Sequence, residues 1–310
     1  DMPFPKCNHQ FPDGRFLYAA IEKDGGEVAA FKIQDDRSLL LLNSKPAGGK
    51  GTCHVWADKG HVFASNYSGG NVTCLALLPD GSLGEELANI AFTGSGPHPG
   101  RQQKPYAHGA VSTSDGKFVY VCDLGTDQVW IFRFDRVSGR MQPADPPSGK
   151  VPPGGGPRHP ALSPRGEFLY VNNEMGMSVS AFERNPETGA LRLLQTIPTL
   201  PEGASHEGAS TSGLVMHPTG KWLYVSNRGH NSISVYGVQS DGTLKFLQNT
   251  PSVVDMPREF LIDPSGTWLV AGGQKDGAIA SMKIHAAEGT LTPADRIETG
   301  AVPVSFSFLP

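Results

Sequence analysis

The sequence has no apolar run approaching the roughly 18 residues that a membrane-spanning helix requires. It also has no block of basic residues, and its 26 Lys and Arg are outnumbered by 30 Asp and Glu, which gives a net charge of −4. Such a chain is poorly suited to binding nucleic acid or an anionic lipid surface. We therefore expect neither a nucleic acid nor a membrane as a partner.

Cysteine is scarce as well. Only four of the 310 residues are cysteines, and their spacing includes neither a CxxC pair nor a metal-binding pattern. Cys53 and Cys122 lie in apolar, strand-like runs, so we predict that these two are reduced, buried thiols. We expect a cytoplasmic location, although the sequence leaves a secreted or periplasmic location open.

Familiar catalytic and cofactor motifs are missing too. The sequence contains no HExxH zinc motif, no GxSxG nucleophile elbow and no acidic calcium loop. The glycine run in PGGGPR, residues 153–158, lacks the Lys-Ser/Thr ending of a phosphate-binding loop. We therefore expect neither a metal nor a cofactor.

Helix-like periodicity is nearly absent, whereas turn residues are abundant. The sequence holds 38 Gly and 26 Pro along its whole length, as in proteins built of many short strands. One segment recurs at intervals of about 46 to 56 residues: a glycine turn followed by an aromatic or β-branched apolar run. Its six copies are DGRFLYAAIE (13–22), KGHVFASNY (59–67), DGKFVYVCDLG (115–125), RGEFLYVNNE (165–174), TGKWLYVSNR (219–228) and SGTWLVAGGQ (265–274).

Most copies stand within a set of four strand-like segments. An apolar segment ending in a turn precedes the copy, and an alternating run and a more polar strand follow it, as in SISVYGV and TLKFLQN. Four-stranded units of regular length predict a β-propeller in which each unit is one blade. A two-sheet sandwich is the alternative, but it requires no constant period. We predict an all-β protein with a single β-propeller domain over residues 1–310.

The repeat leaves two blade numbers open. Six sets of second to fourth strands are present, but seven segments resemble an innermost strand, the seventh being AVPVSFSF at 301–308. Propellers usually close when one end of the chain completes the blade begun by the other. We predict a seven-bladed type in which the N-terminal part of the closing blade is missing, with a six-bladed ring as the alternative.

Mostly polar residues recur at two fixed places in the repeat. The first is the start of the innermost strand, and the second is the turn after the second strand, 16 residues later in five of the six units. Both places lie at the same end of an up-and-down blade, so we expect them to face the mouth of a central channel. The first series is Lys6, His54, His108, Arg158, Ser212 and Arg258; the second is Glu22, Tyr67, Leu124, Glu174, Arg228 and Gln274.

Four segments together resemble the lactonase family of seven-bladed propellers: PYAHGAVSTSDGKFVYVCDLGTDQV, GPRHPALSPRGEFLYVNNE, SGLVMHPTGKWLYVSNRG and PREFLIDPSGTWLVAGGQ. The likeness covers nearly the whole chain from residue 10 onward. This family includes propeller-type 6-phosphogluconolactonases and fungal carboxy-cis,cis-muconate cyclases. By resemblance to the cyclase branch, the functional residues are His108, Arg158, Glu174 and Arg228, and all four belong to the two series above.

These residue types suit the opening of a lactone ring. That reaction needs a base for the attacking water, an electrophilic group for the oxyanion and an anchor for substrate charge. His108 titrates near neutrality and can serve as general acid or base. Arg158 and Arg228 can bind a phosphate or carboxylate, or instead form ion pairs that hold blades together. Glu174 can orient one of these groups or remove a proton itself.

Other members of the two series are weaker candidates for substrate contact. Hydrogen bonding within the same face of the protein is the alternative role for them. We predict substrate-binding roles for His54, Tyr67, Arg258 and Gln274.

Two further features are expected to be structural. His159 follows Arg158 on an alternating strand and should therefore point elsewhere. The loop LPEGASHEGAST at 200–211 is expected to be solvated, with a lid that carries His206 or Glu207 as the alternative.

The leading hypothesis is a lactonase that hydrolyses a sugar lactone, with 6-phosphogluconolactone as a candidate substrate. A lactonising isomerase of the muconate-cyclase type would use the same arginines for two carboxylates. A non-catalytic propeller that binds a partner is the alternative from a different class, but it should expose aromatic side chains, and Tyr67 alone represents them in the two series. We therefore expect an enzyme that acts on a small anionic lactone or carboxylate.

Overall fold

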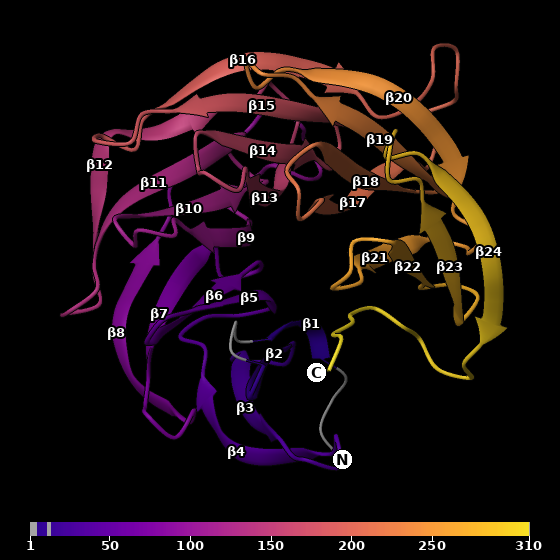
Figure 1. Ribbon diagram of the computed structural model, residues 1–310. Helices are drawn as coiled ribbons and strands as arrows, with labels where there is room; N and C mark the ends of the chain where they lie inside the picture. The colour runs from indigo at the N-terminus through magenta and orange to yellow at the C-terminus, as the bar shows by residue number, and fades with distance from the viewer. Residues whose placement is uncertain (1–4, 11–13, 310) are drawn as a thin grey trace. The chain divides into compact units, whose positions relative to one another are not determined.

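The computed structural model describes residues 5–10 and 14–309. Within these residues the chain forms 24 β-strands and no helix, arranged as six antiparallel sheets of four consecutive strands each (Figure 1). In every sheet the strands follow chain order from one edge to the other. The prediction of an all-β propeller with four-stranded antiparallel blades is confirmed.

The described chain divides into two compact units with three sheets each. Unit 1 comprises the described residues up to Gly149, Thr188–Ala190 and those from Ser307 onward; unit 2 comprises Lys150–Glu187 and Leu191–Phe306. The first three sheets contain β1 (Pro5–Gln10), β2 (Phe16–Ile21), β3 (Glu27–Ile33) and β4 (Leu39–Pro46); β5 (Thr52–Asp58), β6 (His61–Asn66), β7 (Asn71–Leu77) and β8 (Leu83–Ala91); and β9 (Ala107–Ser112), β10 (Phe118–Asp123), β11 (Gln128–Asp135) and β12 (Arg140–Lys150). The other three contain β13 (Pro157–Leu162), β14 (Phe168–Asn173), β15 (Ser178–Arg184) and β16 (Leu191–Pro198); β17 (Ser210–Met216), β18 (Trp222–Arg228), β19 (Ser232–Val238) and β20 (Leu244–Pro251); and β21 (Pro257–Ile262), β22 (Trp268–Gly273), β23 (Ala278–Ile284) and β24 (Leu291–Glu298).

The recurring segment of the sequence forms the second strand of every sheet. Its six copies coincide with β2, β6, β10, β14, β18 and β22. β6 is buried at all six residues and β18 at six of its seven. Both lie in the middle sheet of a unit, where sheets pack against both faces, and this explains why the segment is apolar throughout instead of alternating.

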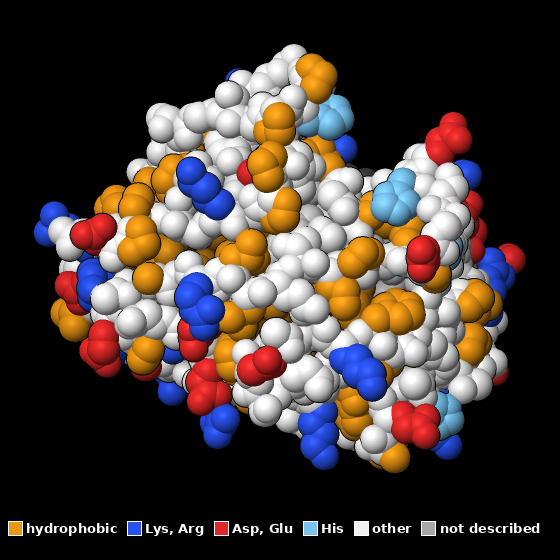
Figure 2. All heavy atoms as spheres, turned by 90° about the horizontal axis from the view of Figure 1, so that it is seen from above, with side chains coloured by type: hydrophobic (Ala, Val, Ile, Leu, Met, Phe, Trp, Pro, Cys, Tyr) orange, Lys and Arg blue, Asp and Glu red, His pale blue; other side chains and the backbone are white. Residues whose placement is uncertain are grey.

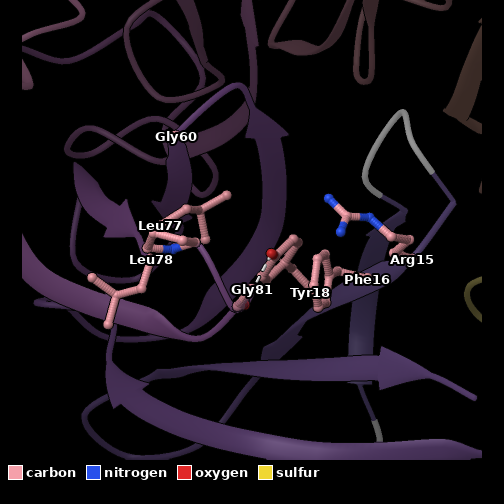
Figure 3. A pocket seen from close by; sticks show the side chains of 8 residues that line it. Arg15, Phe16, Tyr18, Gly60, Leu77, Leu78 and Gly81 are labelled. Atoms are coloured by element: carbon pink, nitrogen blue, oxygen red, sulfur yellow. Dashed lines mark hydrogen bonds between the residues drawn. The ribbon is translucent and has the colours of Figure 1, made fainter.

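Aromatic residues of the second strand fix neighbouring sheets to one another. Tyr18 of β2 donates its hydroxyl hydrogen to the carbonyl of Gly81, at 3.0 Å, and the Phe16 ring lies against the same glycine (Figure 3). Gly81 has a φ of 85°, and a Cβ there would come within 2.2 Å of the Phe16 ring, so only glycine fits this turn. We call this arrangement the aromatic–glycine clasp. It recurs as Phe118 and Tyr120 on Gly189, Phe168 and Tyr170 on Gly242, and Trp222 and Tyr224 on Gly289.

The innermost strand of each sheet carries an irregularity near its start. In all six sheets the register between the first and second strands shifts within the first five residues, as between Pro157 and Pro160 of β13. A bulge of this kind adds a residue to one strand, bends it and re-aims the neighbouring side chains. The first series of the sequence falls on or beside these bulges.

The predicted innermost strand at 301–308 is wrong. This segment forms no strand, and none of the six described sheets includes it. It has the composition of an innermost strand, but a strand also needs a neighbour with which to form a hydrogen-bonded ladder, and no described strand pairs with it. Within unit 2, Pro303 and Phe306 lie across Gly272 of β22 instead. The described chain therefore has six blades, the alternative given above.

Cys53 and Cys122 are free, buried thiols, as predicted, and Cys74 is buried and free as well. Burial raises the pKa of Cys74 to about 12. Burial also raises the pKa of Cys122, and the neighbouring Asp123 carboxylate adds to the rise. Because the thiolate is the reactive form of cysteine, these side chains are protected twice, by inaccessibility and by protonation.

We expect the folded protein to resist thiol reagents at pH 8. The test uses a Cys7→Ser variant, so that only the three described cysteine side chains report, and follows reaction with a chromophoric disulfide reagent. Almost no colour should develop until denaturant is added, after which all three thiols should react. Rapid reaction of even one thiol in the folded variant would contradict the burial described here.

No helix capable of crossing a membrane occurs in the part of the chain that the structure describes. On the face drawn in Figure 2, acidic and basic side chains are interspersed, and neither sign forms a separate patch. Some of the charged side chains of the protein form exposed pairs, such as Arg192 with Glu183. Pairs of this kind contribute only about 0–1 kcal/mol to stability.

Candidate functional site

The candidate residues lie at one end of their sheets, as the two series predict. Pro157 at the start of β13 pairs with Asn173 at the end of β14, so Arg158 and Glu174 occupy the same end of that sheet. The structure describes two groups of candidates, one in each unit. Unit 1 contains His54, Tyr67 and His108, and unit 2 contains Arg158, Glu174, Arg228, Arg258 and Gln274.

Three candidates of unit 2 form a buried ionic cluster, which we call the Arg–Glu–Arg cluster. Arg158 donates from Nε to Glu174 Oε2 at 3.0 Å, and Nη2 of Arg228 lies 3.1 Å from the same oxygen. The three side chains are 3%, 8% and 11% exposed, in the order Arg158, Glu174 and Arg228. Two guanidinium groups that share one carboxylate carry a formal charge of +2 − 1 = +1. The cluster is therefore a nearly dry, net-positive group.

The two arginines differ in what their remaining N–H groups reach. Arg158 donates from Nη1 to the carbonyl of Ser212 at 2.6 Å. Arg228 donates from Nη2 to the carbonyl of Thr211 at 3.1 Å, but its Nε is buried without a hydrogen-bond partner among the described residues. Leaving a buried donor unsatisfied costs about 1–3 kcal/mol, and a native protein tolerates this most readily where a ligand completes the bond. Arg228 therefore has a spare donor.

Neighbouring charges and burial act on Arg228 in opposite directions. Burial, the largest cause, and the positive charges of Arg158 and Arg258 together lower its pKa to about 10, against the opposing effect of the Glu174 carboxylate. A pKa of about 10 leaves Arg228 cationic at neutral pH. The contribution of Arg258 shows that a third guanidinium stands close enough to strengthen the positive potential of the cluster.

Buried asparagines hold the second series in place. Asn173 and Asn227 stand directly before Glu174 and Arg228 in the sequence. They were not among the predicted residues, although an asparagine stands at this place in three of the six copies of the repeat. Each donates from its side-chain amide to two hydroxyl groups of the following strand at 2.9–3.1 Å: Ser178 and Ser180 for Asn173, and Ser232 and Ser234 for Asn227.

The expectation that His159 points away from Arg158 is wrong. Both ring nitrogens of His159 lie 3.1–3.2 Å from Nη1 of Arg158, so the imidazole packs against the guanidinium. The bulge between Pro157 and Pro160 removes the strict alternation on which the expectation rested. The backbone N–H of His159 donates to Asn172 Oδ1 at 2.9 Å, which fixes this part of the bulge. His159 therefore supports the cluster through Arg158.

Glu259 is an ionisable neighbour of the cluster that was not among the predicted residues. It follows Arg258 on the far side of the β21 bulge, opposite Gly272. Its carboxyl lies beside Gly213, where an added Cβ would be 3.2 Å from Oε1. Burial raises the pKa of Glu259, and the positive charges of Arg158 and Arg258 oppose that rise. In the sequence, the available signal for Glu259 was its position directly after Arg258, a member of the first series.

Arg258 and Gln274 lie at the periphery of the cluster with half-buried side chains. The hydroxyl of Ser212 donates to the carbonyl of Arg258 at 2.6 Å. The backbone N–H of Gln274 donates to the carbonyl of Met256 at 3.0 Å. Within the described residues, no hydrogen bond joins the side chain of Gln274 to the cluster, and its role in substrate binding stays a prediction.

The three candidates of unit 1 are grouped around aromatic rings. His108 is buried and meets the Tyr67 ring edge to face, with 5.7 Å between the ring centroids. His54 accepts a hydrogen bond at Nδ1 from the backbone N–H of Ala110, at 3.4 Å. This bond ties β5 to β9, on which His108 lies, so the two histidines belong to adjacent sheets of one unit.

The loop before β9 adds basic and aromatic side chains to this group. None of them was among the predicted residues. Tyr106 stacks on Tyr67, with 4.8 Å between centroids. Nζ of Lys104 lies 5.5 Å from the Tyr106 ring centroid, and Arg101 donates to the Tyr67 hydroxyl at 3.4 Å. Cations over aromatic faces contribute about 0.5–1 kcal/mol at exposed positions. The available signal in the sequence was the segment KPYAHG, in which Lys104 and Tyr106 stand shortly before His108.

Other features lie apart from the candidate residues. The loop before β17 leaves His206 and Glu207 exposed, in agreement with a solvated loop. Two pockets border the clasps of Tyr18 and Phe168, and none of the eight candidates lines either one. Within residues 5–10 and 14–309, no group of three or more His, Cys, Asp and Glu residues is placed to hold a metal ion.

The family model described as "Lactonase, 7-bladed beta-propeller" matches residues 3–308. This chain belongs to the lactonase family. The match confirms the resemblance drawn from the four sequence segments above. The family description counts seven blades, whereas the described part of this lactonase chain contains six four-stranded sheets.

Similar proteins share the fold over most of their length. The lactonase chain is 33% identical over 300 residues to the 6-phosphogluconolactonase of Bacillus subtilis (strain 168), which covers 94% of this chain and 84% of that protein. Among solved structures, a Bacteroides fragilis protein provisionally named 6-phosphogluconolactonase is 31% identical, with a TM-score of 0.89 over 97% of this chain and 86% of that one. The periplasmic gluconolactonase of Pseudomonas aeruginosa is 26% identical, with a TM-score of 0.87 over 95% and 85% of the two chains.

Proposed function

We propose that this protein hydrolyses a sugar lactone and that its substrate is 6-phosphogluconolactone. Membership of the lactonase family and the name of the Bacillus subtilis relative support this reaction. The observation that carries the proposal is the Arg–Glu–Arg cluster with the spare N–H donor of Arg228. A phosphate is an acceptor-only anion, and arginine is the side chain best suited to bind it.

The two arginines have different roles in this proposal. Arg228 binds the anionic group of the substrate, because it retains a buried donor and lies at the more exposed side of the cluster. Arg158 positions Glu174, because its own N–H groups are occupied by Glu174 and Ser212. Arg258 adds positive charge beside them.

Lactone hydrolysis requires two proton transfers. A water molecule loses a proton as its oxygen attacks the carbonyl carbon, and the carbonyl oxygen becomes an oxyanion. The tetrahedral intermediate then collapses, the ring C–O bond breaks, and the released ring oxygen takes up a proton to give the hydroxy acid. We assign these transfers to His108, because imidazole is the side chain whose ordinary pKa lies closest to neutrality. Glu174 holds Arg228 in place for the anionic group of the substrate.

We expect the purified protein to open fresh 6-phosphogluconolactone faster than spontaneous hydrolysis does, and gluconolactone without the phosphate more slowly. A His108→Ala variant should lose at least about 100-fold in kcat/KM, the usual contribution of a general acid or base. Acid release is followed with a pH indicator. His285→Ala serves as the matched control, because His285 is exposed and lies in unit 2.

The outcomes separate the reaction from the assignment of residues. No rate above background with either lactone contradicts the hydrolase, and cyclisation of muconate-type dicarboxylic acids is then assayed with the same protein. Full activity in His108→Ala leaves the lactonase in place but overturns the role of His108. Equal rates for the two lactones overturn the phosphate as the anion bound by Arg228.

We further propose that the protein works in the cytoplasm. Cys74 and Cys122 are free thiols, and reduced cysteine is typical of that compartment. The similar Pseudomonas aeruginosa protein is periplasmic, which makes the periplasm the competing location. Fractionation of cells that express the natural gene, followed by immunodetection, separates the two. Recovery in the periplasmic fraction would contradict the proposal.

A further inference from the structure

The loop that joins β20 to β21, residues 252–256, contains two residues in a backbone conformation that side chains disfavour. Val253 has a φ of 62° and Met256 a φ of 60°. In the left-handed region a β-branched residue such as valine is a genuine outlier, and a folded protein keeps such residues only where the surrounding structure fixes them. We call this segment the strained loop. It leads directly into Pro257 and Arg258, a member of the first series.

A second loop of unit 2 shows the relaxed form of the same chain course. The loop before β13 ends in Gly-Pro-Arg at 156–158, and the strained loop leads into β21 through Met-Pro-Arg at 256–258. Gly156 has a φ of 67°, so the backbone has a positive φ at both places. Glycine adopts this conformation freely, whereas methionine does not. Holding Met256 there therefore requires bonds from the surroundings of the loop.

Asn231, in the turn between β18 and β19, is the residue that holds the strained loop. Its Oδ1 accepts a hydrogen bond from the backbone N–H of Met256 at 3.0 Å, and its Nδ2 donates to Asp255 Oδ1 at 2.9 Å. Its backbone carbonyl accepts from the N–H of Ser252 at 2.8 Å. One residue thus bonds to both ends of the strained loop. Asn231 itself has a φ of 55°, a conformation that asparagine tolerates better than most residues.

The turn between β22 and β23 also bonds to the strained loop. The backbone N–H of Asp255 donates to Asp276 Oδ2 at 3.0 Å, and the Asp255 carbonyl accepts from the N–H of Lys275 at 3.2 Å. The carbonyl of Met256 accepts from the N–H of Gln274, as described above. All four backbone polar groups of Asp255 and Met256 are therefore bonded, which is the fixing that a strained conformation requires.

The strained loop sets the course of the chain beside the Arg–Glu–Arg cluster. The ring of Pro257 restricts its φ, so the direction set by the loop passes on to Arg258. The carbonyl of Arg258 accepts the hydroxyl hydrogen of Ser212, whose own carbonyl accepts from Arg158 of the cluster. The positive charge of Arg258 also lowers the pKa of Arg228, so these two guanidinium groups are close. A change of conformation in the strained loop would therefore move Arg258 relative to the cluster.

We propose that Asn231 is a positioning residue: by fixing the strained loop it holds Arg258 beside the Arg–Glu–Arg cluster, where this guanidinium adds to the binding of the substrate's phosphate group. The inference rests on the proposed function, because that function assigns the phosphate to the cluster. Asn231 acts through the backbone of the loop and does not itself contact the substrate. Loss of its side-chain bonds is therefore expected to weaken phosphate binding and to leave the chemical step nearly unchanged.

The test is an Asn231→Asp variant. Aspartate keeps the oxygen that accepts from Met256 but places a second oxygen against the Asp255 carboxylate, where the amide donates in the wild type. We expect KM for 6-phosphogluconolactone to rise at least about tenfold, with kcat within about threefold of wild type and KM for gluconolactone unchanged. Sulfate, a dianion that is not a substrate, should bind at least about tenfold more weakly to the variant when measured by calorimetry.

Two further variants and a control sharpen the test. Adding Asp255→Asn to Asn231→Asp restores a donor and an acceptor at this contact, so the double variant should regain most of the wild-type KM. Asn231→Gly accepts the positive φ but lacks the side chain, so its KM should rise and Asp255→Asn should not rescue it. Asn43→Asp is the matched control: Asn43 bonds to both backbone groups of Leu83 in unit 1, so this change removes a comparable donor and should leave KM unaltered.

The outcomes distinguish this inference from the proposed function. If the wild type opens the phosphorylated lactone and KM is unchanged in Asn231→Asp, the role of Asn231 alone is overturned. If the wild type binds sulfate but opens no lactone, the hydrolase is contradicted, and equal sulfate affinities of wild type and Asn231→Asp would overturn the inference as well. A wild type that neither opens the lactone nor binds sulfate overturns both. An equal rise in KM for the two lactones would show a general loss of structure and would also overturn the positioning role.

Discussion

A Glu174→Gln variant is expected to lose about 100-fold in kcat/KM for 6-phosphogluconolactone. Glutamine keeps the size of the side chain but removes the negative charge that Arg158 and Arg228 share. The two guanidinium groups then face each other in a buried place without a counterion, so their orientation toward the substrate is lost. The comparison uses steady-state rates of acid release, measured on wild type and variant at the same pH.

The same substitution should also lower the free energy of unfolding by about 3–5 kcal/mol, because it breaks a buried ion pair and leaves uncompensated charge. Glu183→Gln is the matched control, since Glu183 pairs with Arg192 on the surface. That variant should change the free energy of unfolding by less than about 1 kcal/mol and leave the rate unaltered. Similar denaturant midpoints and rates for the two variants would show that the Arg–Glu–Arg cluster has no special role.

The Arg–Glu–Arg cluster illustrates what spacing in a sequence can and cannot predict. The 16-residue interval placed Arg158 and Glu174 at the same end of one sheet, and the structure joins them by a hydrogen bond of 3.0 Å. Spacing along a strand predicts position, however, and not the direction of a side chain at a bulge. His159 was therefore assigned to the wrong side, and the ionisable neighbour Glu259 was overlooked.

The fold shows a similar limit. The recurring aromatic segment was sufficient to predict four-stranded blades, because a buried second strand must be apolar on both faces. The segment at 301–308 has the same apolar character as an innermost strand, but strand formation depends on a pairing neighbour that its own sequence does not encode. The clasps were also not predicted, since the aromatic residue and the glycine of each clasp stand more than 60 residues apart.

A similarly large stability effect is expected from Trp222→Ala, which should lower the free energy of unfolding by about 3–5 kcal/mol. Trp222 is 7% exposed, lies on Gly289 and belongs to the core between two sheets of unit 2. Its removal leaves a cavity beneath the turn at Gly289. Glycine has no side chain that could fill the cavity. Chemical denaturation monitored by circular dichroism gives the change, with the slope of the transition checked for constancy.

Trp268→Ala provides the comparison, because it removes the same side chain from the same register of the repeat. Trp268 is 39% exposed, so its loss should cost only about 1 kcal/mol or less. Equal losses for the two variants would contradict the difference in burial between the two tryptophans.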